Sequence, residues 1–230
     1  MKELKTIRER VSFLLEFIEN KKIEVGITHP ITIVAISKTF SPEDITEVIK
    51  AGIKDIGENR VQEAESKFEK LSNLEFTKHL VGHLQTNKIN KALKIFDWIH
   101  SIDSFELAEK ISKKLSEMNK TLPVLIEVNT SFEKTKFGIE PEKTIDLAGK
   151  ILELKYLNLS GLMTIGPLTD DIKRIRESFK LLYNLREKMK THFHREFPHL
   201  SMGMSDDFEI AIEEGATILR LGRIIFGRRI

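Results

Sequence analysis

The chain has 230 residues, of which 40% are hydrophobic and 31% charged, and its formal net charge is +2. This length suits one domain with a substantial core, and the charge balance gives no electrostatic case for nucleic acid or an acidic membrane as a partner. The absence of cysteine excludes disulfides, thiolate metal sites and a cysteine nucleophile, and it fits a reducing compartment. No apolar run is long enough to span a bilayer, and the first residues lack the pattern of a secretory signal. We therefore expect a cytoplasmic protein with one domain over residues 1–230.

The apolar residues near the start recur at helical spacing and predict an amphipathic helix: Leu4, Ile7, Val11, Leu14, Leu15 and Ile18. Strand-like segments follow at 31–37, 55–57, 76–81, 98–101, 122–128, 157–163, 199–202 and 218–221. Helical patterns lie between them, most clearly at 105–118, 141–154 and 170–190, and Ser41-Pro42 is typical of a helix start. Strands that alternate with helices predict a parallel sheet, and eight such units predict a (β/α)8 TIM-type barrel with an N-terminal helix. An open, doubly wound sheet is the alternative.

In a barrel of this type the functional residues follow the carboxyl ends of the strands. Lys38 ends the apolar segment VAISK, so its amine is expected in the barrel mouth. Partial desolvation there would lower the pKa of the amine and favour the neutral, nucleophilic form that condenses with an aldehyde to an imine. The alternative is a lysine whose side chain passes the barrel rim and reaches water.

Two later segments complete a candidate site. In LSMGMSDD, residues 200–207, Ser205 is expected to cap the helix that follows, and the same glycine and hydroxyl groups are suited to phosphate. At the end of the last strand-like segment, Gly222 allows a phosphate close to the backbone, and Arg220 is placed to meet a ring nitrogen. Each feature has a plainer interpretation, a capped helix or a surface ion pair. Together, imine former, phosphate cradle and ring partner are what pyridoxal 5′-phosphate requires.

Several short motifs resemble those of the pyridoxal phosphate homeostasis proteins, which are related to the N-terminal barrel of alanine racemase. They are AISKT from residue 35, GENRVQE from 57, GHLQTNK from 82 with His79 before it, SID from 101, GLM from 161, LSMGMSDD from 200 and RLG from 220. The strings LSMGMSDD and GENRVQE are specific, whereas SK alone is not. The resemblance covers nearly the whole chain.

The resemblance implies a role for each matching position. Lys38 is similar to the imine-forming lysine, and Arg220 to the arginine that faces the pyridine nitrogen. The positions that match phosphate-contacting residues are Ser205, Gly222 and Arg223, and those that match residues lining the cofactor are Asn59 and Met202. Members of the family are regarded as carriers or regulators of vitamin B6 without an established reaction, and pyridoxal phosphate-dependent apoenzymes are the expected recipients.

The sequence departs from the family pattern at three positions. Arg223 replaces a common threonine, so a hydroxyl contact to phosphate is lost while the backbone N–H remains. Arg60 replaces a tyrosine, and His83 replaces a proline. These changes bear on the mouth of the site and leave the imine-forming lysine in place.

We expect no enzymatic activity. An arginine at the pyridine nitrogen does not transfer a proton to the ring, which disfavours carbanion chemistry. Racemisation needs two bases, and neither tyrosine, Tyr156 or Tyr183, follows an expected strand end. A slow racemase with His79 or Lys38 as base is the alternative.

A third interpretation is a scaffold whose basic helix at 180–190 recruits RNA or a protein partner. The histidines at 192, 194 and 199 do not have the spacing of a helical metal site, so no metal is expected. We expect a monomer, because no second domain of the racemase kind follows the last predicted barrel unit.

Overall fold

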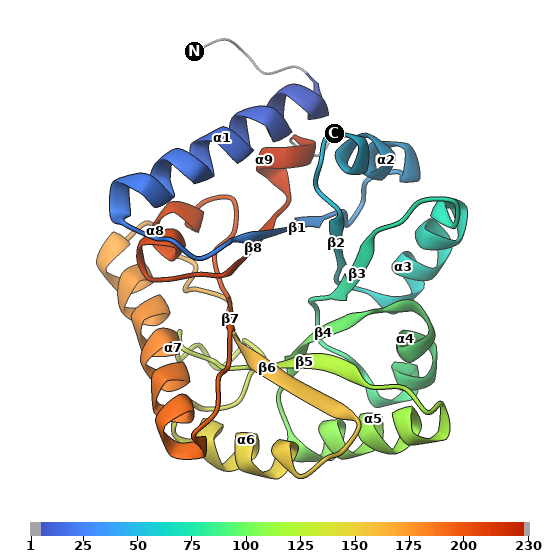
Figure 1. Ribbon diagram of the computed structural model, residues 1–230, viewed down its shortest axis with the longest axis vertical. Helices are drawn as coiled ribbons and strands as arrows, with labels where there is room; N and C mark the ends of the chain where they lie inside the picture. The colour runs from blue at the N-terminus through green and yellow to red at the C-terminus, as the bar shows by residue number, and fades with distance from the viewer. Residues whose placement is uncertain (1–5, 228–230) are drawn as a thin grey trace.

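The computed structural model describes residues 6–227, so Leu4 of the predicted N-terminal helix lies outside the described residues. Within this range the strands are parallel and close into a barrel in chain order, from β1 to β8 (Figure 1). The pairing of β1 with β8, which aligns Val34 with Arg220, completes the ring. The predicted (β/α)8 barrel is therefore confirmed, and the open-sheet alternative is wrong.

The strands are β1 (Thr32–Ile36), β2 (Asp55–Glu58), β3 (Thr77–Leu80), β4 (Trp98–Ile102), β5 (Leu122–Glu127), β6 (Leu157–Met163), β7 (His199–Ser201) and β8 (Ile218–Leu221). The helices are α1 (Ile7–Val25), α2 (Pro42–Lys50), α3 (Val61–Phe68), α4 (Ile89–Ile95), α5 (Phe105–Glu117), α6 (Thr144–Leu152), α7 (Ile172–Phe193), α8 (Phe208–Glu213) and α9 (Arg223–Phe226). Short 3-10 turns follow α3 and precede α4 and α6. Figure 1 shows α1 packed outside the ring, across β1 and β8 and beside α8 and α9.

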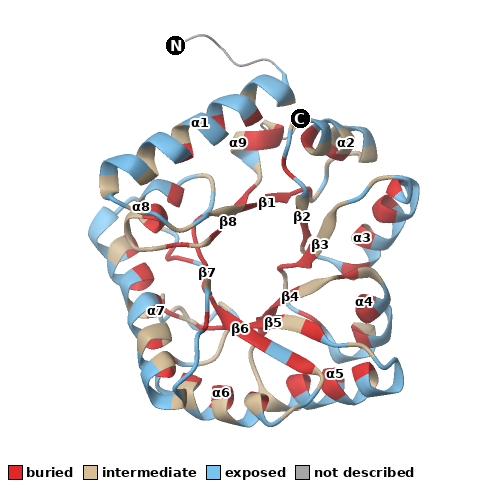
Figure 2. Ribbon diagram, in the orientation of Figure 1, coloured by how far each residue is buried: buried red, intermediate tan, exposed pale blue. Residues whose placement is uncertain are grey.

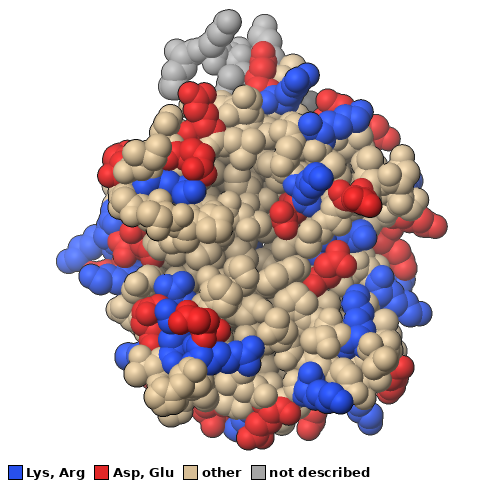
Figure 3. Space-filling model, viewed as in Figure 1, with Lys and Arg blue, Asp and Glu red and all other residues tan. Residues whose placement is uncertain are grey.

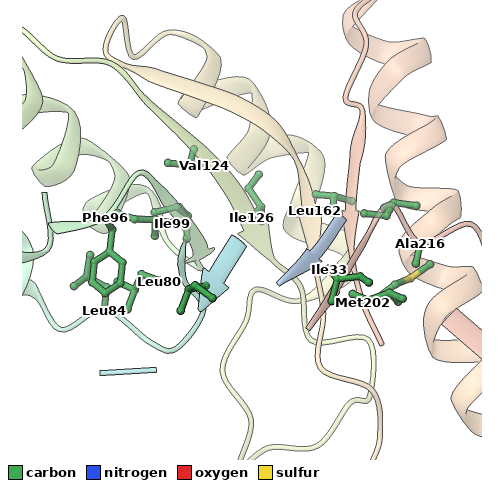
Figure 4. Packing of buried hydrophobic residues seen from close by; sticks show 14 of the residues in the cluster. Ile33, Leu80, Leu84, Phe96, Ile99, Val124, Ile126, Leu162, Met202 and Ala216 are labelled. Carbon is green, nitrogen blue, oxygen red and sulfur yellow. The ribbon is translucent and has the colours of Figure 1, made fainter. Parts of the chain in front are cut away.

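Most of the hydrophobic core lies between the strands and the surrounding helices, whose inward faces are buried and outward faces exposed (Figure 2). Figure 4 shows this layer, with Phe96 beside Ile99 and Leu84, and Met202 near Ala216. A smaller cluster fills the barrel interior: Val34, Ile36, Val81, Leu125, Met163 and Ile218, with Trp98 against it. Successive strand residues point to opposite faces, so a residue two positions from one of these side chains also points into the barrel. This alternation identifies the polar side chains of the interior.

Two helix starts differ in how they are capped. The start predicted at Ser41-Pro42 is confirmed, since the Ser41 hydroxyl accepts a hydrogen bond from Asp44 N at 3.2 Å in a reciprocal capping box. Ser205 as N-cap of the next helix is wrong. Residues 205–207 form a turn, so α8 begins only after Asp207, whose carboxylate accepts a hydrogen bond from Met204 N at 2.5 Å.

The surface mixes charges of both signs. On the face in Figure 3, lysine and arginine alternate with aspartate and glutamate around the periphery, and no single-sign patch covers it. On α7, Arg186 and Lys190 both pair with Glu187, so part of the basic helix is balanced by acidic neighbours. None of the helices within residues 6–227 combines the length and apolar character that a membrane crossing requires.

The core makes a quantitative prediction. Phe96 is fully buried and lies edge-on to Phe68, so Phe96→Ala is expected to lower the free energy of unfolding by about 3–5 kcal/mol. Phe132, which is 67% exposed, is the matched control, and Phe132→Ala should change that free energy by less than about 0.5 kcal/mol. Urea unfolding followed by circular dichroism measures both, and equal losses would contradict the packing described.

Candidate functional site

Lys38 lies just beyond β1, in a turn whose backbone is fixed from both sides. Val34 and Ile36 point into the barrel, so the same alternation directs Lys38, which is half-buried, toward its mouth. The next residue, Thr39, has a φ of 71°, a left-handed conformation that non-glycine residues adopt only when they are held. Its N–H donates to Glu63 Oε1 at 2.6 Å. The turn that carries Lys38 is thus constrained by α3.

The buried ammonium of Lys67 holds the other side of this turn. Its Nζ donates to the Ser37 carbonyl at 2.7 Å, to Glu58 Oε1 at 2.8 Å and to Glu63 Oε1 at 2.7 Å. The Ser37 hydroxyl also donates to Glu58 Oε1, at 2.7 Å. Burial raises the pKa of the Glu58 carboxyl, and the hydrogen bond from Lys67 opposes that rise. Sequence reasoning missed this cluster, although Glu63 and Lys67 stand four residues apart, as helical ion pairs do.

Arg220 lies inside the barrel at the end of β8 and is only 5% exposed, so the surface ion pair considered for it is wrong. Its Nη1 donates to Ser201 Oγ at 2.8 Å, and its Nη2 to the Thr164 carbonyl at 2.7 Å. Burial lowers the pKa of the guanidinium to about 10, against the opposing effects of Glu127 and Asp207. The group therefore remains a cation and a hydrogen-bond donor at neutral pH.

A column of polar side chains continues from Arg220 through the barrel. Ser201 Oγ lies 3.1 Å from His100 Nδ1, and His100 Nε2 lies 3.0 Å from His79 Nδ1. His79 Nε2 meets Asp55 Oδ1 at 2.9 Å, at the amino end of β2. Burial holds the pKa of His100 well below its usual range. Both ring nitrogens of His79 are thus engaged in the interior, away from the mouth.

The residues predicted to contact phosphate lie in two neighbouring loops, after β7 and β8. Ser205 Oγ accepts a hydrogen bond from Ile224 N at 3.4 Å, which joins the loops. A Cβ on Gly222 would lie 3.3 Å from the Ile36 carbonyl oxygen, so the backbone passes close to the end of β1. The side chain of Arg223 is 59% exposed and forms an ion pair with Asp206. Its guanidinium therefore lies outside the barrel interior that holds Arg220.

A pocket of about 740 Å³ opens at the same end of the barrel, over the ends of β2, β3, β5 and β6. Its walls include Asn59, Gly82, His83, Glu127, Phe137 and Ile165. A Cβ on Gly82 would lie 2.4 Å from the Asn59 carbonyl oxygen, so only glycine fits this wall. The ring of His83 stacks on that of Phe137, with 4.1 Å between centroids. His83 and Arg60, which both depart from the family pattern, therefore shape the pocket wall.

Glu127, at the end of β5, is a buried acid of this pocket that sequence reasoning missed. Its inward direction follows from Leu125, two residues before it, and only 3% of it is exposed. Burial raises the pKa of its carboxyl to about 7; Arg220 lowers the value and Asp103 raises it further. Among the residues that the structure describes, none makes a hydrogen bond or an ion pair with this carboxyl. The signal in the sequence was an acid that ends a strand otherwise made of apolar residues.

The structure brings most of the predicted site together but not all of it. Lys38, Ser205, Arg220, Gly222 and Arg223 come from the adjacent strand ends of β1, β7 and β8, and Asn59 follows β2. The side chain of Met202 does not join them. It is fully buried in the layer between strands and helices, because Ser201 before it points inward. Within residues 6–227, no group of three or more histidine, aspartate or glutamate side chains is arranged to hold a metal ion.

This arrangement suits a small phosphorylated aldehyde with a ring nitrogen. For such a ligand Lys38 would offer an amine, the serine and glycine loops would offer donors to the phosphate, and the buried guanidinium of Arg220 would offer a donor that keeps its own proton. The open pocket beside them gives such a ligand room to enter. The residues present therefore fit pyridoxal phosphate.

Comparison with known proteins agrees with this fit. The sequence model of the family "Alanine racemase, N-terminal domain" matches residues 16–229. A pyridoxal phosphate homeostasis protein of Aquifex aeolicus is 43% identical over 222 residues, which are 96% of this chain and 97% of the relative. The protein of that name from Helicobacter pylori is 39% identical over 221 residues, covering 95% of this chain and 97% of the relative.

Solved structures give the same result. PipY of Synechococcus elongatus, solved with pyridoxal phosphate bound, has a TM-score of 0.81 and 32% identity, covering 91% of this chain and 100% of PipY. An alanine racemase of Clostridium difficile has a TM-score of 0.73 at 15% identity, covering 94% of this chain and 56% of the racemase, and shares the fold alone. The chain belongs to the pyridoxal phosphate homeostasis proteins, whose barrel is that of the alanine racemase N-terminal domain.

Proposed function

We propose that this protein holds pyridoxal 5′-phosphate as an imine on Lys38 and acts as a carrier or regulator in the homeostasis of that cofactor. The observation that carries the proposal is that Lys38 and the buried cation Arg220 come from neighbouring strands, β1 and β8, at one end of the barrel. Arg220 is buried inside the barrel, and the alternation of β1 directs Lys38 toward the mouth. The turn of Lys38 is fixed by Glu63 and Lys67, so the amine is presented from a rigid backbone.

In this proposal the remaining predicted residues hold the phosphate and the ring. Ser205 and the backbone of Gly222 and Arg223 donate to the phosphate, and Asn59 lines the cofactor. Arg220 donates to the pyridine nitrogen. Met202 contributes through the packing that supports β7 and not through its side chain at the mouth. The bound form of PipY supports this assignment by relationship.

The proposed role is not catalytic. Bound pyridoxal phosphate supplies an electron sink that is deepest when its ring nitrogen is protonated, and the Arg220 guanidinium retains its own proton at neutral pH. His79, the alternative racemase base, hydrogen-bonds through both ring nitrogens and is 2% exposed. Tyr183 lies on α7, outside the barrel, and Tyr156 precedes β6 at its amino end. Relatives are named for homeostasis and not for a reaction, which supports the same view.

The proposed recipients are pyridoxal phosphate-dependent apoenzymes of the cytoplasm, and the barrel is proposed to act as a monomer. The lack of cysteine supports a reducing compartment. The mixed charge on the face in Figure 3 supports transfer of a small molecule rather than binding of nucleic acid.

Removal of the Lys38 amine tests the cofactor assignment. Lys38→Ala is expected to lose the near-visible absorption band and the borohydride-stable adduct, because no amine remains at the end of β1, while circular dichroism stays that of the folded barrel. Peptide mass spectrometry after borohydride treatment identifies the modified lysine in the wild type. An adduct that persists on another lysine as the main species in the variant would overturn the assignment.

The departure at residue 223 yields a second test. Arg223→Ala is expected to change the dissociation constant for pyridoxal phosphate less than about fivefold, because an exposed ion pair is worth at most about 1 kcal/mol and the backbone N–H is retained. Gly222→Val should weaken binding more, since a side chain there crowds the Ile36 carbonyl. Fluorescence titration of the apoprotein compares the two. A larger loss in Arg223→Ala would assign the phosphate contact to its guanidinium.

The racemase alternative has its own measurement. Incubation of the cofactor-loaded protein with L-alanine in deuterium oxide is expected to give no deuterium at the α-carbon and no D-alanine, because the Arg220 guanidinium keeps its own proton and leaves the pyridine nitrogen unprotonated. Mass spectrometry with chiral chromatography detects both products. Deuterium incorporation with inversion that is lost in Lys38→Ala would establish a slow racemase instead.

A further inference from the structure

The barrel mouth has two parts, and the residues proposed to hold the phosphate lie in only one of them. The predicted phosphate residues Ser205, Gly222 and Arg223 come from the loops after β7 and β8. The pocket of about 740 Å³ lies over the ends of β2, β3, β5 and β6, and of the predicted site residues only Asn59 lines it. A cofactor held by the β7 and β8 loops would therefore leave room beside it for a second small molecule.

Glu127 is a buried acid that lines this pocket. Only 3% of it is exposed, and within residues 6–227 its carboxyl has no hydrogen bond or ion pair, although the charge of Arg220 lowers its pKa. Glu58, which is also buried, accepts hydrogen bonds from Ser37 and Lys67 at Oε1, while its Oε2 has no partner among the described residues. Buried carboxylates are ordinarily hydrogen-bonded or paired, because desolvation disfavours the charged form. Since Glu127 faces the pocket, a cation that enters the pocket can supply such a partner.

The chemistry of the walls identifies a cationic, partly apolar partner. Glu127 is an acceptor when ionised, and Val81, Phe137 and Ile165 offer apolar contact to an alkyl chain. The pocket walls also carry two cationic side chains, the exposed Arg60 and the half-buried Lys88, and they include Glu63 and His83. Asp103 raises the pKa of the Glu127 carboxyl and Arg220 lowers it. His83 Nδ1 lies 3.4 Å from Asp103 Oδ2.

We propose that Glu127 forms a subsite for the ammonium group of an incoming primary amine and accepts its proton, so that this amine can take the cofactor from Lys38. This inference rests on the proposed function. In a ring of eight strands β1 and β5 lie opposite each other, so Lys38 and Glu127 approach the mouth from opposite walls. The amine is either a free amino acid, whose carboxylate would meet Arg60 or Lys88, or a lysine side chain of a recipient protein.

The proton balance of the exchange explains the use of an acid here. A primary amine is protonated at neutral pH, with an ordinary pKa of about 10.4, and is not nucleophilic until it loses that proton. The Glu127 carboxylate takes one proton of the ammonium group, and the amine so formed bonds to the carbon that Lys38 holds. The two protons left on the incoming nitrogen pass to the Lys38 nitrogen as its bond to that carbon breaks, so Lys38 leaves as a free amine. Glu127 then gives its proton to that amine or to water, and nothing is oxidised or reduced. The pKa of Glu127 near 7 suits a group that both accepts and returns a proton.

The ammonium subsite can be tested without cofactor. In the apoprotein, n-propylammonium is expected to lower the pKa of the Glu127 side-chain carboxyl, followed by ¹³C NMR, because a bound cation favours the carboxylate. Sodium acetate at the same concentration is the control and should leave that pKa where it was. If n-propylammonium does not move the pKa, the subsite does not exist and the inference is overturned, whether or not Lys38 binds the cofactor.

The pH dependence of the free energy of unfolding tests whether the Glu127 carboxyl is desolvated, as the subsite requires. Folding raises the pKa of Glu127 from 4.5 to about 7, so the folded state keeps this proton to higher pH than the unfolded chain does. The free energy of unfolding of the wild type should therefore fall, relative to that of Glu127→Gln, as pH rises from 4.5 to 7. A difference between the two proteins that does not vary with pH would mean that the carboxyl is paired or hydrated, against the inference.

Exchange kinetics test the proton transfer. The cofactor-loaded wild type is mixed with n-propylamine, L-alanine or Nα-acetyl-lysine methylamide between pH 5 and 9, and loss of the borohydride-stable Lys38 adduct is timed. The wild-type rate should rise through a step near pH 7. Glu127→Gln should lose that step and react about 100-fold more slowly above it, whereas Glu140→Gln, a change at an exposed surface ion pair, should match the wild type.

The amine that reacts fastest identifies the source of the incoming amine. A preference for L-alanine identifies free amino acids as the source of the amine, and a preference for the lysine derivative identifies protein side chains. Unchanged exchange in Glu127→Gln together with weaker cofactor binding would mean that Glu127 contacts the cofactor itself, and the inference fails. A wild type without any Lys38 adduct would overturn the proposed function instead, while the NMR titration would still decide the ammonium subsite.

Discussion

The buried guanidinium of Arg220 is the constraint around which the barrel interior is organised. A cation taken out of water needs hydrogen-bond acceptors and opposite charge, or its desolvation would destabilise the fold. The Ser201 hydroxyl and the Thr164 carbonyl provide the acceptors, and Glu127 and Asp207 provide the charge. These groups come from strands or loops on several sides of the ring. One charge thus requires polar neighbours inside a barrel that also holds the apolar cluster containing Val34, the residue that pairs in register with Arg220.

The polar column below Arg220 follows from the same requirement. Asp55 can only accept a hydrogen bond, so its contact with His79 places a proton on His79 Nε2. Burial holds the pKa of His100 well below its usual range, and this ring lies between His79 and the Ser201 hydroxyl. Ser201 Oγ also accepts from Arg220 Nη1. The column therefore links the buried cation to the Asp55 carboxylate at the amino end of β2. These contacts leave Arg220 with fixed partners and a fixed orientation.

The sequence allowed the architecture and the position of Lys38 after the first strand to be predicted because both depend on local patterns. Alternating segments predicted the barrel, and the strand end at VAISK placed Lys38. The cap at Ser205 was wrong, because a tight turn from Met204 to Asp207, closed by hydrogen bonds between these two residues, delays the start of α8 to Phe208. Helix α4 received no range of its own, since its seven residues are too few for a clear period.

The groups that tune the site were missed for a related reason. Lys67 and Glu127 are common residue types whose meaning depends on burial and on partners far away in sequence. Lys67 bonds to Ser37, 30 residues away, and Glu127 is defined by a pocket whose other walls follow β2, β3 and β6. Motif matching also carried Met202 into the site, although strand alternation at Ser201 turns its side chain outward. Periodicity applied to each short strand would have made that distinction, but β7 has only three residues from which to read it.

The distribution of charge at the mouth follows from which strands end in which groups. The lysine follows β1, the buried arginine belongs to β8, and the buried acid Glu127 belongs to β5, on the far side of the ring from β1. An anionic cofactor is attracted to the first pair and repelled by the last, so its phosphate and its ring are directed to one half of the mouth. The same acid attracts a cation to the other half. A carrier needs such a division, because a site that only binds its cofactor tightly would not release it. Release by exchange requires a place for the incoming amine while the cofactor is still bound.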